Sequence, residues 1–186
     1  RYSLDFIYAL PGQTASAWRS ELEEILELAG GHLSLYQLTI EPGTQFHKDR
    51  VPSAGEDAAE VLFDISRNVT RAAGLVNYEI SNYGLLGQEC RHNLVYWRGE
   101  DYLGIGPGAH GRLPIHRQNA EVAIETVQEI RLPSAWLMAV QSGEGGTQKR
   151  TPLSREERFE ELLLMGLRLT EGINFSRFER LFGSPL

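Results

Sequence analysis

Apolar positions in the first eighty residues follow the periods of strands and helices in turn. Mostly apolar runs over 3–8, 32–40 and 75–80 predict three β-strands. Between them, 15–29 and 56–73 place apolar side chains at helical spacing, and each of these stretches is followed by glycine. Strand, helix, strand, helix and strand with short links form a βαβ series. The pattern therefore predicts an α/β fold with a parallel sheet and right-handed crossovers.

Capping residues support the predicted helix starts. Thr14 can cap the first helix, and Ser53-x-x-Glu56 has the pattern of a capping box. Near the C-terminal end, Ser154 can cap an amphipathic helix over 155–170, and a further helix is predicted from Phe175 onward. These last helices indicate the start of a small helical domain.

The middle of the chain is less regular. Residues 81–111 are rich in glycine and aromatic side chains and show no clear period. Residues 132–142 predict a short helix, and 143–152 (GEGGTQKRTP) predict a linker because of their glycines and polar side chains.

Polar residues interrupt the predicted strands, although strands of a parallel sheet covered on both faces are mostly apolar. Asp5 lies in the first strand, Gln37 and Thr39 in the second, and Asn77 and Glu79 in the third. Burying a polar group is costly unless it is paired. A polar row across neighbouring strands predicts the inner wall of an open barrel or the rim of a site. The alternative is polar strand ends that are satisfied locally.

Composition and charge narrow the class of protein. The 186 residues are 41% hydrophobic and 23% charged, with a formal net charge of −7. These values are typical of a globular protein and argue against nucleic acid as a partner, because phosphate binding needs a basic surface. No apolar run approaches the roughly 20 residues of a membrane-spanning helix. The single cysteine, Cys90, excludes an internal disulfide and an all-cysteine metal site in this chain, and it fits a reducing cytoplasm.

Two motifs suggest binding chemistry. Residues 106–111 (GPGAHG) match the G-x-G-x-x-G pattern of dinucleotide-binding folds, but Pro114 stands where that fold needs a helix. We therefore interpret these glycines as points of close backbone approach. Residues 92–97 (HNLVYW) combine an imidazole, an amide, a phenol and an indole. Imidazole is a common axial ligand of heme iron, and an indole offers a flat apolar face to a macrocycle. The alternative is that these side chains only pack and hydrogen-bond.

Long stretches of this sequence resemble the HemN/HemW-like family of radical S-adenosylmethionine (SAM) proteins. The resemblance is carried by 4–14 (LDFIYALPGQT), 34–44 (SLYQLTIEPGT), 78–83 (YEISNY), 89–99 (ECRHNLVYWRG), 101–111 (DYLGIGPGAHG), and 161–169 with Gly172 and Ile173. Ala9 stands where the family usually has glycine. The resemblance covers nearly the whole chain, and only residues 113–151 carry no pattern typical of the family.

This resemblance implies an architecture and two cofactors. It implies part of a radical SAM partial (β/α) barrel over 1–112, a connecting region over 113–152, and the start of the family's C-terminal helical domain over 153–186. It also implies that Asp5 contacts SAM and that a [4Fe–4S] cluster is bound through a three-cysteine motif upstream of this chain. We therefore expect a fragment that neither holds the cluster nor cleaves SAM by itself.

The resemblance also assigns the H-N-x-x-Y-W motif to heme. In this sequence the motif is His92, Asn93, Tyr96 and Trp97, with His92 as the expected ligand of the heme iron. The implied function is that of a cytoplasmic heme chaperone that delivers heme to acceptor proteins. The alternative is an oxygen-independent coproporphyrinogen III oxidase, which would form a 5′-deoxyadenosyl radical from SAM and decarboxylate its substrate.

Overall fold

The computed structural model describes residues 2–116 and 122–183. The chain divides into two compact units, 1–90 and 91–186, and each contains its own cluster of buried apolar side chains. The division into three parts at 112 and 152 stays a prediction.

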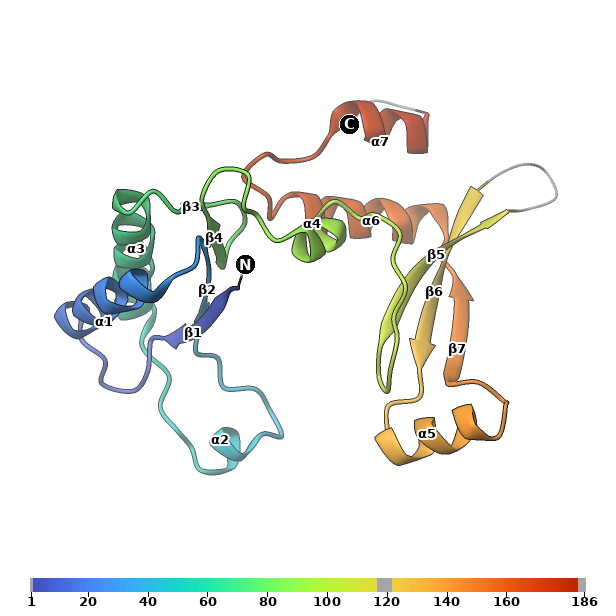
Figure 1. The fold of residues 1–186 in the computed structure, drawn as a ribbon, viewed down its shortest axis with the longest axis horizontal. Coiled ribbons are helices and arrows are strands. Elements are labelled where there is room, and N and C mark those ends of the chain that lie inside the picture. Colours follow the sequence, from blue (N-terminus) through green and yellow to red (C-terminus); the bar gives the residue numbers. More distant parts are fainter. Residues whose placement is uncertain (1, 117–121, 184–186) are drawn as a thin grey trace. The chain divides into compact units, whose positions relative to one another are not determined.

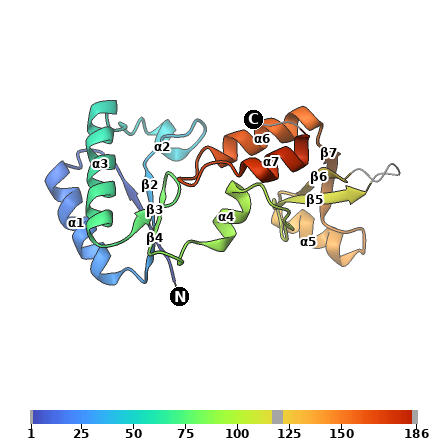
Figure 2. The ribbon, with the colours of Figure 1, turned by 90° about the horizontal axis from the view of Figure 1, so that it is seen from above.

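The first unit is a mixed α/β layer structure (Figure 1). Its strands are β1 (Leu4–Tyr8), β2 (His32–Gln37), β3 (Val76–Asn77) and β4 (Asn82–Gly84), in the sheet order β1-β2-β4-β3. Its helices are α1 (Ala15–Leu28), α2 (Gln45–Lys48) and α3 (Glu56–Ala72). Figures 1 and 2 show α1 and α3 side by side along the sheet, and residues of both helices join its apolar core.

Alternate strand residues build the core of this unit. Tyr8, Leu33 and Leu35 are almost fully buried on the face that carries α1 and α3. Tyr8 stacks on Trp18 of α1 with ring centroids 5.4 Å apart, and burial raises the pKa of Tyr8 to about 12. The Trp18 indole N–H donates to Ser66 Oγ of α3 at 2.9 Å. The alternation of the strands directs their other residues to the opposite face, where Asp5 and Ser34 lie together with the exposed Ile7 and Tyr36.

The predicted parallel pair is confirmed, whereas the prediction for the third strand is wrong. Residues 4–8 of β1 pair in parallel with 33–37 of β2. The predicted strand 75–80 shrinks to the two residues of β3, and the chain then turns back into β4, which pairs antiparallel with both β2 and β3. At this turn the buried Glu79 accepts hydrogen bonds from Ser81 N and Asn82 Nδ2 at 2.7 and 2.6 Å. This topology does not show a (β/α) barrel, which stays a prediction.

Helix caps explain where the predicted helices begin. Thr14 caps α1, its Oγ1 accepting from Ala17 N at 3.2 Å. The capping box predicted at Ser53 is wrong, because Gly55 is the N-cap of α3 and makes no side-chain hydrogen bond. The cap at Ser154 is confirmed as a full capping box with Glu157.

In its described residues, the second unit joins a three-stranded antiparallel sheet to four helices. Its elements are α4 (Arg91–Trp97), β5 (His110–His116), β6 (Val122–Glu129), α5 (Pro133–Gln141), β7 (Thr147–Pro152), α6 (Arg155–Gly166) and α7 (Phe175–Phe182). The sheet order is β5-β6-β7, and α5 lies at one end of the sheet (Figure 1). Most of the predicted linker 143–152 is in fact strand β7, which pairs with β6 and places Arg150 3.0 Å from Glu125.

Aromatic side chains pack α6 against α7. Phe159 of α6 meets Phe178 and Phe182 of α7 edge to face, with ring centroids 5.1 and 5.5 Å apart. Leu162 completes this small core. In the part of the chain that the structure describes, no helix has the length and apolar content needed to span a bilayer.

Candidate functional site

The four residues of the H-N-x-x-Y-W motif lie on one short helix, α4. His92 and Tyr96 are one turn apart and share one side of it, and their rings meet edge to face with centroids 4.7 Å apart. Tyr96 meets Tyr102 in the same way at 4.5 Å. The His92 side chain is exposed, so its imidazole is accessible to a ligand. These three side chains form an aromatic row that ends in an exposed imidazole.

Asn93 and Trp97 occupy a neighbouring side of α4, because each lies about 100° around the helix from His92 or Tyr96. Trp97 is partly buried, and the Arg168 guanidinium lies over its ring, 4.4 Å from Cζ to the ring centroid. The Trp97 indole N–H is buried and has no hydrogen-bond partner within the described residues. The structure thus separates Trp97 from the exposed pair of His92 and Tyr96.

The C-terminal end of α4 is fixed by Gly99. Gly99 N donates to Tyr96 O at 2.9 Å and Glu100 N donates to Val95 O at 2.8 Å, a Schellman motif with Gly99 at φ +60°. Gly99 is buried, and a Cβ at this position would overlap the side chain of Leu162 in α6. Glycine is therefore needed both for the backbone angle and for the packing of α4 on α6.

Arginines of α6 and α7 hold the main chain at this point. Arg158 of α6 and Arg177 of α7 both donate to the carbonyl of Gly99, the latter at 2.9 Å, and Arg177 also donates to the carbonyl of Arg98. Burial lowers the pKa of Arg158, and the nearby Arg177 lowers it further, while the Glu161 carboxylate opposes the shift. The motif helix is thus attached to the two C-terminal helices through the carbonyl groups of Arg98 and Gly99, the residues that follow it.

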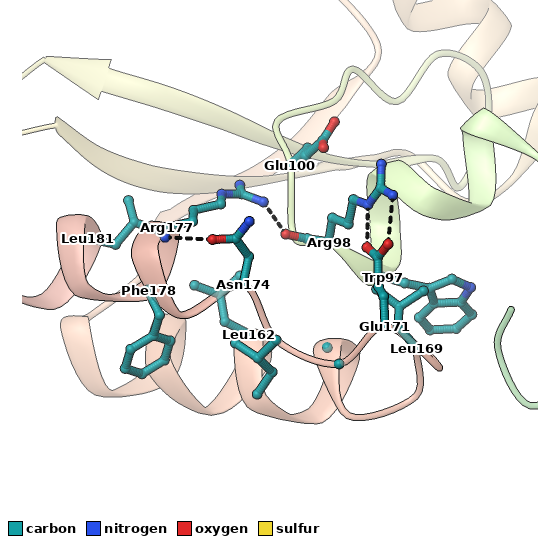
Figure 3. A pocket seen from close by; sticks show the side chains of 13 residues that line it. Trp97, Arg98, Glu100, Leu162, Leu169, Glu171, Asn174, Arg177, Phe178 and Leu181 are labelled. Carbon is teal, nitrogen blue, oxygen red and sulfur yellow. Dashed lines mark hydrogen bonds and ion pairs between the residues drawn. The ribbon is translucent and has the colours of Figure 1, made fainter. Parts of the chain in front are cut away.

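A cavity of about 450 Å³ adjoins this attachment inside the second unit (Figure 3). Its wall includes Trp97 but none of the other three motif residues. Arg98 donates from Nε and Nη2 to the Glu171 carboxylate at 2.8 and 3.1 Å, and these hydrogen bonds lower the pKa of Glu171. Figure 3 shows this ion pair at one side of the cavity and Arg177 at the other.

Asp5 lies on the sheet face of the first unit that is turned away from the core. Its neighbours Leu4 and Phe6 pack against the core, so the alternation of β1 directs the exposed Asp5 to the opposite face. Its register partner on β2 is Ser34, which donates to Asn82 Oδ1 of β4 at 2.9 Å. An exposed carboxylate on this face can accept hydrogen bonds from the ammonium or hydroxyl groups of a ligand such as SAM.

The predicted polar row was only partly right. Gln37 is the last residue of β2 and Thr39 lies beyond the strand, so the row continues from Asp5 through Ser34 and Asn82 instead. A signal for Ser34 was present in the sequence, because it stands two residues from another polar residue, His32, in the same strand.

Sequence reasoning also missed a histidine network beside Asp5. His32 Nδ1 lies 2.7 Å from Ser3 Oγ, and His32 Nε2 lies 2.8 Å from Tyr78 Oη. Burial lowers the pKa of His32, and the negative charges of Asp5 and Glu89 oppose this shift. Within residues 2–116 and 122–183, no group of three or more His, Cys, Asp or Glu side chains could hold a metal ion.

Comparisons with known proteins include a family model for the C-terminal residues and relatives that align with nearly the whole chain. Residues 153–186 match the family described as the HemN C-terminal domain. The chain is 39% identical over 183 residues to "Radical S-adenosyl methionine domain-containing protein 1, mitochondrial" of Danio rerio, covering 96% of this chain and 41% of that protein. It is 31% identical over 192 residues to the heme chaperone HemW of Bacillus subtilis, and this match covers 99% of this chain and 47% of HemW.

One solved structure shares the fold. It is the coproporphyrinogen III oxidase HemN of Escherichia coli, described as a radical SAM enzyme, with a TM-score of 0.74 and 14% identity. The match covers 98% of this chain and 43% of that one. The chain therefore spans less than half the length of these relatives, and the likeness to HemN concerns the fold alone.

Proposed function

This chain belongs to the HemW/HemN-like family of radical SAM proteins, and we propose from that premise that the protein carrying it binds heme and passes it to acceptor proteins. One observation carries the proposal. A chain that aligns with the heme chaperone HemW over 99% of its length presents the H-N-x-x-Y-W motif on one helix with an exposed imidazole.

The proposed roles follow from the geometry of α4. His92 supplies an imidazole nitrogen to the heme iron. Tyr96 and Tyr102, whose rings continue the row from His92, supply an apolar surface for the macrocycle. Asn93 and Trp97 lie further around the helix, so in this proposal they border the heme rather than face its iron.

The same family membership supports SAM and a [4Fe–4S] cluster in the complete protein, where together they supply radical chemistry. In this chain Asp5 is the residue proposed to hold SAM, through a charge-assisted hydrogen bond from its exposed carboxylate. On the same sheet face as Asp5, His32 is hydrogen-bonded to the hydroxyl groups of Ser3 and Tyr78. The cytoplasmic location stays a prediction, since the relative from Danio rerio is named as mitochondrial.

Heme titration tests the proposal. Hemin is added to the complete protein that carries this sequence, and the Soret absorbance is followed to saturation. His92→Ala should weaken binding by more than about tenfold, because even outer-shell partners of metal ligands contribute about 10–100-fold. His47→Ala removes another exposed histidine, on α2, and should leave binding unchanged. Equal binding by both variants would remove His92 from the site.

Oxidative decarboxylation of coproporphyrinogen III is a second candidate function, favoured by the fold shared with HemN of Escherichia coli. The two functions are separated by product analysis after anaerobic incubation of the reconstituted protein with SAM, a reductant and coproporphyrinogen III. Formation of protoporphyrinogen would favour the oxidase. Unchanged substrate, together with saturable heme binding, would favour the chaperone.

A further inference from the structure

The cavity beside α4 combines an apolar wall with a guanidinium group. The apolar wall is formed by Leu162, Leu169, Ile173, Phe178 and Leu181. Arg177 of α7 lines the same cavity, as Figure 3 shows. The volume of about 450 Å³ falls in the range of roughly 300–1,000 Å³ found for small-molecule sites, which are mostly apolar with a few polar groups.

Among the described residues, Arg177 is held by main-chain carbonyls rather than by a carboxylate. Its guanidinium donates to main-chain carbonyls, and within the described residues no carboxylate lies at ion-pair distance from it. Arg158 shares one of these carbonyls, that of Gly99. The nearby Glu161 already pairs with Arg158 at 2.7 Å and with Arg112 at 3.0 Å. The negative charge of Asp101 also acts on Arg158. These carboxylates are therefore engaged by arginines other than Arg177.

The two carboxylates on the cavity wall do not neutralise Arg177. Glu171 is engaged by two hydrogen bonds from Arg98. Figure 3 shows the Glu100 carboxylate directed away from the apolar wall. An anionic group entering beside Arg177 would thus meet a guanidinium that has no ion-pair partner of its own among the described residues.

We propose that this cavity binds a carboxylate carried on an apolar body, with Arg177 as its charge partner. A guanidinium has five N–H donors, and its planar fork matches a carboxylate. The apolar wall accepts the rest of the ligand. Heme has this chemistry in its propionate groups, and Trp97 connects the cavity to the motif helix. For this source of the carboxylate the inference rests on the proposed function. An alkyl carboxylate is the other source with the same chemistry.

The test changes the ligand as well as the protein. Heme and its dimethyl ester, which lacks the propionate charges, are titrated into the complete wild-type protein and into Arg177→Gln. Heme should bind wild type at least about tenfold more tightly than the ester, because a charge-assisted hydrogen bond is lost. Arg177→Gln should lose the same factor for heme and little for the ester. Arg180→Gln, an exposed arginine on the same helix, should behave as wild type.

A second probe separates the two sources of the carboxylate. Octanoate and its neutral amide are titrated by calorimetry into the same proteins. One outcome is that octanoate binding requires Arg177 while heme and its ester bind equally well. This outcome would uphold the site and identify an alkyl carboxylate as its ligand. Because the ester and amide comparisons use wild type, a folding defect in Arg177→Gln does not decide the result.

Failure of this inference differs from failure of the proposed function. If wild type binds heme and its ester equally and no octanoate, the inference is overturned and heme binding stands. If wild type binds no heme, the proposed function fails, and the cavity site then stands or falls on Arg177-dependent binding of octanoate.

Discussion

Replacing Gly99 with alanine tests how the motif helix is held, because two separate features of the structure require glycine there. Gly99 has φ +60°, and a Cβ would overlap Leu162 Cδ2 of α6. Its carbonyl also accepts hydrogen bonds from Arg158 and Arg177. Gly99→Ala therefore strains the main chain and displaces α4 from α6 at the point where the arginines hold it.

The expected cost has two parts. A left-handed backbone angle costs a non-glycine residue about 1–2 kcal/mol. Forcing an extra methyl group into packed side chains costs about 1–3 kcal/mol more. The sum is about 2–5 kcal/mol, and in a domain of roughly 100 residues each kcal/mol lowers Tm by about 4–8 °C. Gly99→Ala should therefore lower the Tm of the second unit by at least about 8 °C.

Urea unfolding followed by tryptophan fluorescence measures this cost, with Gly143→Ala as the matched control. Gly143 has φ +84° and no other atom within 4 Å of a Cβ, so its replacement carries only the backbone part. In a double-mutant cycle, Leu162→Ala should recover about 1–3 kcal/mol of the cost of Gly99→Ala. If Gly99→Ala costs no more than Gly143→Ala, the contact with Leu162 does not hold α4 on α6.

Three further predictions concern single side chains. Burial lowers the pKa of His32 in the folded protein. As the pH falls past about 6.5, His32 is therefore protonated in the unfolded chain before it is protonated in the folded one, and this favours unfolding. The Tm of the wild type should therefore fall between pH 7.5 and 5.5, and the Tm of His32→Asn should fall less over the same range. An equal fall in both proteins would mean that other groups cause it. Ser66→Ala leaves the buried Trp18 indole N–H without its acceptor and should cost about 1–3 kcal/mol in urea unfolding, whereas no cost would mean that another acceptor replaces it. Glu171→Gln breaks an exposed ion pair with Arg98 and should cost less than about 1 kcal/mol, and a larger cost would show that this pair holds the cavity together.

The elements that the sequence predicted well are those with a strong local signal. Helix α1 combines a Thr14 cap with apolar residues that repeat at helical spacing, and α6 begins at a complete capping box on Ser154. The pair β1 and β2 was predictable because apolar residues recur at alternate positions in both strands and α1 joins them. In each of these cases neighbouring residues carry the information.

The elements that the sequence missed depend on distant partners. All six residues of β7 are exposed, so no apolar period marks it, and it forms because β6 offers a pairing edge. β5 contains Pro114, which an edge strand tolerates. The third strand ends early because Glu79 forms hydrogen bonds across a turn, which a count of apolar residues does not reveal.

The candidate site divides in the same way. Residues 92–97 are contiguous and could be found as a motif. The arginines that hold the end of this helix at Gly99, Arg158 and Arg177, stand 59 and 78 residues further along the chain. Only the fold brings them together, and the cavity lined by Arg177 follows from that arrangement.

The heme content of the protein as purified from a heme-replete host shows whether the protein binds heme through His92. The pyridine hemochrome assay is applied to the complete protein, to His92→Ala and to His47→Ala. We expect bound heme in the wild type and in His47→Ala and a large loss in His92→Ala. Heme-free wild-type protein, or the same heme content in all three, would contradict it.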